Sequence, residues 1–101
     1  VNTINLLVNK IDGANRDLII NVAGQLKANL HQYIMVLFGL SSNGNCLYVA
    51  TDLNNQHAGN IARAICQITG GSGGGKPTEA NGRINNLTDL KAVEDLIVNL
   101  L

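Results

Sequence analysis

The residues best suited to chemistry lie in one short stretch, residues 69–78, which reads TGGSGGGKPT. Residues 70–76 have the spacing G-x-x-x-x-G-K of a phosphate-binding loop, in which backbone amides and a lysine hold phosphate groups. The stretch has three interpretations: a nucleotide site, a flexible linker, or a loop that binds another phosphate-bearing partner.

The nucleotide-hydrolysis interpretation conflicts with the residues around the glycines. The motif needs Ser or Thr directly after its lysine to bind a metal ion, but Pro77 stands there and Thr78 comes one position late. A phosphate-binding loop also follows a strand and opens a helix, so that the helix N-terminus meets the phosphates. Here the glycines follow a predicted helix, and no later strand supplies a metal-binding Asp.

A linker is also disfavoured, because Pro77 stiffens the exit from the glycines and both flanking segments have packed, amphipathic patterns. Glycines without side chains let a backbone approach a partner closely. Successive amides can form a nest for an anion, with Lys76 adding charge at its rim. We therefore expect this loop to bind a phosphate, a ribose edge or an exposed base.

No catalytic or metal-binding pattern is visible elsewhere. His31 and His57 have no nucleophile paired with them, and the acidic residues are scattered. Cys46 and Cys66 lack a CxxC pattern or a histidine at metal spacing, and we interpret them as buried reduced thiols. The sequence thus predicts no catalytic residue, no metal and no cofactor.

Composition indicates one small domain with an aliphatic core, since 46% of the 101 residues are hydrophobic and only three are aromatic. The formal charge is zero, which argues against strong nonspecific nucleic-acid binding through many phosphate contacts. A local basic edge remains open, as does ordinary surface charge: Arg63, Lys76, Arg83 and Lys91 all fall in the second half. No apolar run approaches the roughly 18 residues of a membrane span, so we expect no membrane partner. Because the chain starts at Val1, we interpret it as a piece of a longer protein.

Hydrophobic periodicity predicts an alternation of strands and helices. The first half is expected to contain a strand at 3–11, a helix at 16–30 capped by Asn15, a strand at 33–40, an Asn-Gly turn within 41–45 and a strand at 46–50. The run YIMVLFGL is continuously apolar and fits a central strand buried on both faces. The apolar face expected for the first helix is Leu18, Ile19, Val22, Ala23, Leu26 and Leu30. The order strand–helix–strand predicts a right-handed crossover, and the turn adds an antiparallel third strand.

The second half is expected to contain a helix at 57–69, ended by Gly70 and Gly71, then the glycine loop, an irregular stretch to Asn86, and a helix at 89–100 capped by Thr88. The inward positions expected in these helices are Ile61, Ala62, Ile65 and Ile68, and then Leu90, Val93, Leu96, Ile97 and Leu100. The predicted fold is a single α/β domain over residues 1–101, a small mixed β-sheet with packed helices in the order β-α-β-β-α-Gly-loop-α.

Residues 57–82 carry a specific resemblance. The stretch resembles the signature of the DHH-associated domain and, more closely, the C-terminal domain of alanyl-tRNA synthetase. The matching features are Ala58-Gly59 at the helix start, the glycine run with Ser72 as a substitution, Lys76-Pro77 for Arg-Pro, Ala80-Asn81 for Ala-Gln, and Gly82. The departures are Thr78 in place of Asp, Glu79 in place of a hydrophobic residue, and Arg83-Ile84 after a reduced glycine pair.

The resemblance implies a noncatalytic appendage that follows the catalytic, editing and helical linker regions of an alanine–tRNA ligase. In that family the domain binds the tRNA elbow, where the D and T loops meet, and assists aminoacylation and editing. The implied partners are tRNA, most directly tRNA-Ala, and the rest of the synthetase chain. The implied location is the cytoplasm or, alternatively, the mitochondrial matrix.

Two alternatives stay open. Some members of the family have exchanged tRNA binding for DNA binding or homodimerisation. Related glycine loops also help hold the substrate in DHH phosphoesterases, where they end in Gly-Gly-His; Lys76 stands in place of that histidine.

From the motif we expect tRNA contacts along the glycine loop and its exit, with weaker candidates on the preceding helix. These residues are Gly71, Ser72, Gly73, Gly74, Gly75, Lys76 and Arg83, with Asn60 and Arg63 from the helix. The glycines would supply close approach and amides, while Lys76 and Arg83 would meet phosphates.

Overall fold

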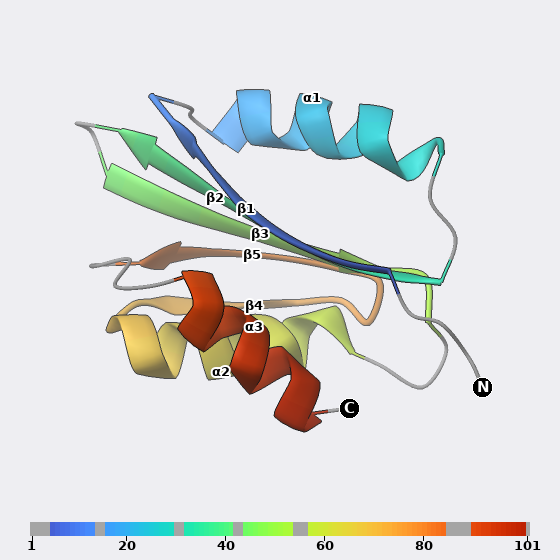
Figure 1. Ribbon diagram of the computed structural model, residues 1–101. Helices are drawn as coiled ribbons and strands as arrows, with labels where there is room; N and C mark the ends of the chain where they lie inside the picture. The colour runs from blue at the N-terminus through green and yellow to red at the C-terminus, as the bar shows by residue number, and fades with distance from the viewer. Residues whose placement is uncertain are drawn as a thin grey trace.

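A computed structural model describes residues 5–13, 16–29, 32–41, 44–53, 57–84 and 90–100 (Figure 1). Its elements follow the chain in the order β1 (Asn5–Asp12), α1 (Arg16–Lys27), β2 (Tyr33–Ser41), β3 (Gly44–Thr51), α2 (Ala58–Thr69), β4 (Ser72–Gly75), β5 (Glu79–Ile84) and α3 (Leu90–Leu100).

The strands form one mixed sheet in the order β1-β2-β3-β5-β4. β1 and β2 are parallel and are joined through α1, whereas the β2–β3, β3–β5 and β4–β5 pairs are antiparallel. The predicted strand–helix–strand crossover and the β2–β3 hairpin are therefore confirmed.

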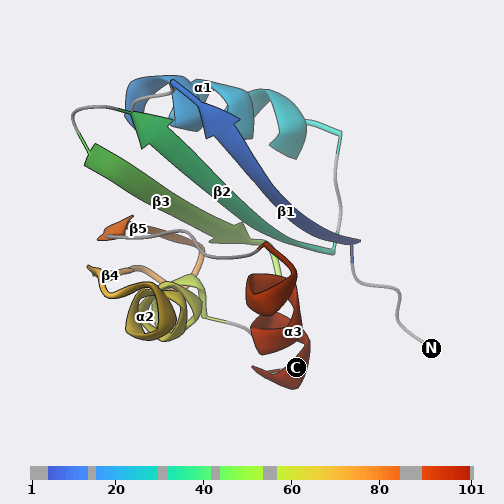
Figure 2. The same ribbon diagram turned by 60° about the vertical axis from the view of Figure 1, so that its left-hand side comes forward.

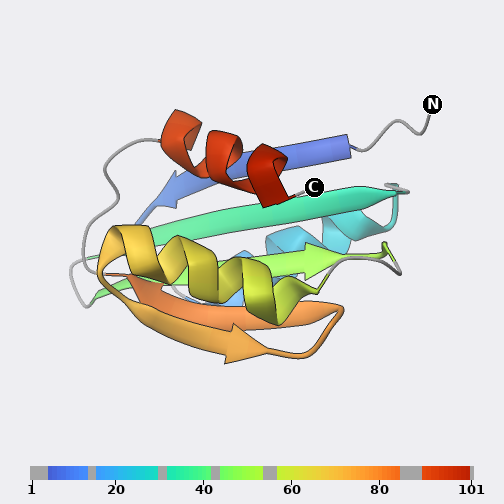
Figure 3. The ribbon, with the colours of Figure 1, turned by 90° about the horizontal axis from the view of Figure 1, so that it is seen from below.

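The helices cover the two faces of the sheet unequally. α1 lies on one face, above β1, β2 and β3, while α2 and α3 lie on the other (Figure 2). Seen from below, α2 lies along the β5–β4 side and α3 along β1 (Figure 3). The sheet thus has a helix on both faces at one end and on a single face at the β4 end.

β2 is buried on both faces, as its continuous apolar run predicts. Ile34, Val36 and Phe38 join the core under α2 and α3, and Met35 and Leu37 join the core under α1. All five side chains are at most 1% exposed. The alternation follows from the two-residue period of a strand.

The structure corrects the predicted glycine loop. Residues 72–75 form the edge strand β4, and the stretch expected to be irregular contains β5, so the sheet has five strands and not three. Glycine and asparagine are depleted in strands, and SGGG carries no apolar alternation. β5 forms because it pairs with β3, and β4 forms because it pairs with β5 and packs closely on α2. These contacts cannot be predicted from the local sequence.

Two predicted inward positions are wrong: Leu18 on α1 is 46% exposed and Ile68 on α2 is 47% exposed. Each residue lies at the margin of the apolar stripe of its helix. Only the side chains at the centre of the stripe pack against the sheet, so those at the margin stay exposed. α1 ends at Lys27, earlier than predicted. The predicted caps Asn15 and Thr88, Leu30, and the side chains of Leu90 and Leu100 lie outside the described residues.

Candidate nucleic-acid interface

The helix α2 is fixed at both ends, which sets where β4 begins. The His57 side chain caps its N-terminus by accepting a hydrogen bond from the Asn60 amide at 3.3 Å. At the other end Gly70 adopts the left-handed conformation, with φ 77°, that glycine favours at a helix C-terminus. The Gly71 amide donates to the Cys66 carbonyl at 3.0 Å, and the chain passes directly into β4.

Most glycines of the run are required by packing inside the domain. A side-chain carbon on Gly73 would lie 2.9 Å from the Asn81 carbonyl oxygen, and one on Gly75 would lie 2.7 Å from the Glu79 carbonyl oxygen. A side-chain carbon on Gly71 would lie closer still to the Arg83 carbonyl oxygen. These glycines therefore let β4 meet β5 and α2 without a side chain between them.

The anion nest expected of the loop is not formed by residues 71–75. A nest alternates right- and left-handed backbone conformations, and among the described glycines only Gly13, Gly44 and Gly70 have positive φ. The run is extended, so its amides point alternately to the two sides of the strand. Any partner must use the strand's edge or its open face.

Gly74 differs from its neighbours. The three atoms nearest to a side-chain carbon placed there all belong to the Arg63 guanidinium, the closest being Nε at 3.4 Å, an ordinary contact. Arg63 is held in turn by a 2.9 Å hydrogen bond from its Nη1 to the Asn60 side-chain oxygen. The structure thus brings together Asn60, Arg63 and Gly74, three residues predicted from sequence to bind RNA.

The β4–β5 hairpin has an open face on the side away from α2. Cross-strand partners point their side chains to the same face, and the register pairs Ser72 with Arg83 and Gly74 with Asn81. Ser72 and Arg83 are exposed, and Gly74 and Asn81 are half-buried. We call these four residues the open face. On the sheet's other side, Gly73 and Gly82 approach the Cys66 sulfur, which confirms the assignment of faces.

The two cations expected to meet phosphates are separated. Arg83 pairs with Ser72 at the start of β4, whereas Lys76 follows the end of β4, where its amide donates to the Glu79 carbonyl at 2.8 Å. Both side chains are exposed. Lys91 lies on α3, away from the hairpin.

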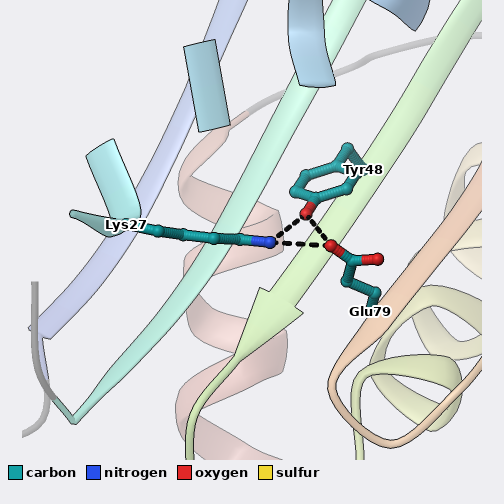
Figure 4. A network of polar contacts seen from close by, with 3 residues as sticks. All are labelled: Lys27, Tyr48 and Glu79. Carbon is teal, nitrogen blue, oxygen red and sulfur yellow. Dashed lines mark hydrogen bonds and ion pairs between the residues drawn. The ribbon is translucent and has the colours of Figure 1, made fainter. Parts of the chain in front are cut away.

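A polar network joins α1, β3 and β5 beside the connection between β4 and β5 (Figure 4). Lys27 Nζ donates to the Tyr48 hydroxyl at 2.5 Å and to Glu79 Oε2 at 2.8 Å, and the Tyr48 hydroxyl donates to the same carboxylate oxygen at 2.9 Å. Lys27 also lies 5.1 Å from the centre of the Tyr48 ring. The network ties the last turn of α1 to β5.

The network shifts the protonation equilibria of its members. Hydrogen bonds from Lys27 and Tyr48 lower the pKa of Glu79. Burial alone would lower the pKa of Lys27, but its bonds to Glu79 and Tyr48 outweigh burial and raise that pKa. Burial raises the pKa of Tyr48. All three shifts favour the ammonium, the phenol and the carboxylate that the contacts require.

Sequence reasoning missed this network because its members come from three elements far apart in the chain. Glu79 was noticed only as a departure from the family pattern, and neither Lys27 nor Tyr48 falls in a motif. Asn81 was matched to the pattern but not assigned a contact, and the open face now includes it.

Within the described residues, no three His, Cys, Asp or Glu side chains come close enough to hold a metal ion. Cys66 is buried as predicted, whereas Cys46 is only half-buried, and both are free thiols. No helix among the described residues is long and apolar enough to cross a membrane. The arrangement offers binding groups on a hairpin.

Comparison with known proteins agrees with this geometry. Over 84 residues the chain is 36% identical to the alanine–tRNA ligase of Clostridioides difficile and 39% identical to that of Dehalococcoides mccartyi, covering 79% and 78% of this chain. The chain spans about a tenth of the length of these curated relatives, since each match covers 10% of the relative.

The fold is that of a solved domain. The crystal structure of the C-Ala domain from Aquifex aeolicus alanyl-tRNA synthetase superposes with a TM-score of 0.80 at 13% identity, covering 97% of this chain and 89% of that one. Residues 3–101 match the profile of the DHHA1 domain. The chain belongs to the DHHA1 domain family, and its sequence relatives are alanine–tRNA ligases.

Proposed function

We propose that this domain is the noncatalytic, RNA-binding C-terminal appendage of an alanine–tRNA ligase. It holds the elbow of the tRNA, where the D and T loops meet, and so helps present the acceptor end to the aminoacylation and editing sites. The partners are tRNA-Ala and the rest of the ligase chain, in the compartment where the ligase works.

The observation that carries the proposal is Gly74. Packing explains the other glycines of β4, but the atoms nearest to a side-chain carbon at Gly74 all belong to the flexible Arg63. A glycine that the interior does not need, on an accessible face, leaves room for a flat group from outside. Exposed RNA bases and sugar edges at a folded corner are such groups.

The surrounding charges suit a backbone that crosses the hairpin. Arg63 lies at Gly74, and Arg83 and Lys76 lie near opposite ends of β4. Lys76 comes four residues after Ser72, about 13 Å along the chain at the usual strand rise. The two cations therefore meet different phosphates of one strand, while Arg63 serves the middle.

The neutral formal charge limits the expected strength of RNA binding. Three phosphate contacts predict a salt slope of roughly two to three, far below that of a strongly basic DNA-binding protein. Binding by this domain alone is therefore expected to be modest, with shape and base contacts supplying selectivity.

The test is a titration of the domain with tRNA-Ala at two salt concentrations. An isolated elbow fragment should compete, whereas an acceptor-stem minihelix and duplex DNA of equal length should not. Equal binding to the duplex would replace this proposal with DNA binding. Self-association without RNA binding would replace it with dimerisation, and selective binding of short nucleotides with the substrate-binding domain of a phosphoesterase.

A further inference from the structure

Asn81 occupies the centre of the open face. It lies in the middle of β5, paired with Tyr48 of β3 on one side and with Gly74 of β4 on the other. The neighbour on the β4 side has no side chain, and the residue is half-buried. A group that approaches over Gly74 therefore finds no β4 side chain between it and Asn81.

The Asn81 side chain has an unmet hydrogen-bonding capacity. Its oxygen, Oδ1, is buried and accepts no hydrogen bond from the described residues. The hydroxyl of its cross-strand partner Tyr48 is already engaged with Lys27 and Glu79. A buried acceptor without a donor costs free energy and calls for an explanation.

Folding does not supply that explanation. Asparagine is depleted in strands, where a β-branched residue fits the pleated surface better. The core below β5 is built from Ala80 and Ile84, which point to the other face. Stability alone would favour an apolar, branched side chain at position 81.

We infer that Asn81 reads an RNA base at the open face, an inference that rests on the proposed function. No hydrogen bond at Oδ1 holds the side chain in the rotamer that buries this oxygen. A change of rotamer toward the space beside Gly74 would bring the oxygen to the surface, where the carboxamide presents an acceptor and a donor side by side. Adenine offers the complementary pair, the N6 donor next to the N7 acceptor, and asparagine is a known partner for that edge. Gly74 has no side chain that would block the base, and the neighbouring Arg63 guanidinium is placed to meet the adjoining phosphate.

The diagnostic variant is Asn81→Val, which removes the amide and places a good strand former on β5. It should raise the melting temperature and weaken tRNA-Ala binding by about five- to tenfold, the lower end of what one good side-chain-to-base pair contributes. The salt slope should stay unchanged, because a neutral base contact releases no counterion. Arg83→Gln is the matched control and should lower the slope by about one.

A second arm identifies the atom that is read. A set of tRNA-Ala transcripts each carries a single 7-deaza-adenosine, at an elbow adenine whose N7 takes no part in tertiary pairing. The transcripts modified at the adenine that is read lack its N7 acceptor and keep the fold of the tRNA. Their affinity for the wild-type domain should equal the affinity of normal tRNA for Asn81→Val. Their affinity for Asn81→Val should be no lower than that of normal tRNA, because the contact is already lost. Asn81→Gln keeps both hydrogen-bonding groups and should retain most of the affinity.

The outcomes separate the two levels of the account. If the wild-type domain binds no tRNA, the proposed function fails and this inference fails with it. If the wild type binds tRNA but Asn81→Val binds equally well, the proposed function stands and the reading role of Asn81 is overturned. If the deaza transcript bound Asn81→Val still more weakly than normal tRNA does, the two losses of affinity would be independent, and the reading role would also be overturned.

Discussion

A side-chain carbon placed on Gly59 would lie 2.6 Å from the carbonyl oxygen of Gly75, closer than packed atoms approach. The first turn of α2 thus touches the end of β4 through backbone alone. The Gly59 amide donates to the Lys76 carbonyl at 3.2 Å, and the Ala58 amide to the Pro77 carbonyl at 2.8 Å. Helix and hairpin therefore form one rigid support for the open face.

Gly59→Ala should destabilise the domain, because its methyl group has no room against the backbone. Overpacking of this kind costs about 1–3 kcal/mol, which urea denaturation can measure. Gly24→Ala is the matched control, since a carbon there meets nothing within 4 Å. It should instead stabilise α1 by up to about 1 kcal/mol, the difference in helix propensity. Equal effects of the two substitutions would contradict the close contact.

Gly74→Val should separate folding from binding. The nearest neighbours of the new Cβ are atoms of Arg63, which can move, so the free energy of unfolding should change little. The same side chain occupies the place where a base would lie, so tRNA affinity should fall at least tenfold. Circular dichroism melts and a binding titration measure the two quantities. An intact fold with unchanged affinity would remove Gly74 from the interface.

Glu79→Gln should cost stability at neutral pH and not in acid. The pKa of Glu79 lies below its usual value of 4.5, because Lys27 and Tyr48 donate hydrogen bonds to the carboxylate. A lowered pKa in the folded state stabilises the fold above that usual value, and the effect disappears as pH falls through the lowered value. The residue is exposed, so the loss at pH 7 should be below about 1 kcal/mol.

The measurement for Glu79→Gln is a pair of urea titrations at pH 7 and pH 3, with Glu94→Gln on α3 as the control. The wild type and Glu79→Gln should differ at pH 7 and converge at pH 3, while the control changes little at either. A difference that grew in acid would contradict the direction of the pKa shift.

Cys66 should react slowly with a thiol reagent until the domain opens. Burial raises the pKa of its thiol, and its sulfur lies against Gly73 and Gly82 between α2 and the hairpin. Reaction requires the thiolate and access. In Ellman's assay on Cys46→Ser, which leaves Cys66 alone, the rate should rise steeply with urea in step with unfolding. Fast labelling of the native protein would show that α2 and the hairpin separate readily.

The elements that sequence reasoning predicted are those whose signals are local. The apolar run of β2, the pairing of β2 with β3 as a hairpin, and the stripe of α2 apart from Ile68 hold in the structure. β4 was missed because Gly73, Gly74 and Gly75 carry no strand propensity, and their conformation is imposed by β5 and α2. A chain of small residues can be called a strand only once its neighbours are known.

The candidate site divides in the same way. Arg63 and Asn60 are one helical turn apart on α2, so their proximity follows from helix geometry. The distance between Lys76 and Arg83 depends on the length of the unforeseen hairpin. The Lys27–Tyr48–Glu79 network and the position of Asn81 depend on the strand order, which no motif encodes.

The most direct test of the central claim is an amide chemical-shift titration of the domain with the tRNA elbow fragment. The account predicts shifts concentrated at residues 72–75 and 81–83 and at Arg63, with little change at Leu18 and Ile20 on the outer side of α1. Shifts gathered on α1 or α3, with the hairpin unchanged, would contradict the assignment of the open face as the RNA-binding surface.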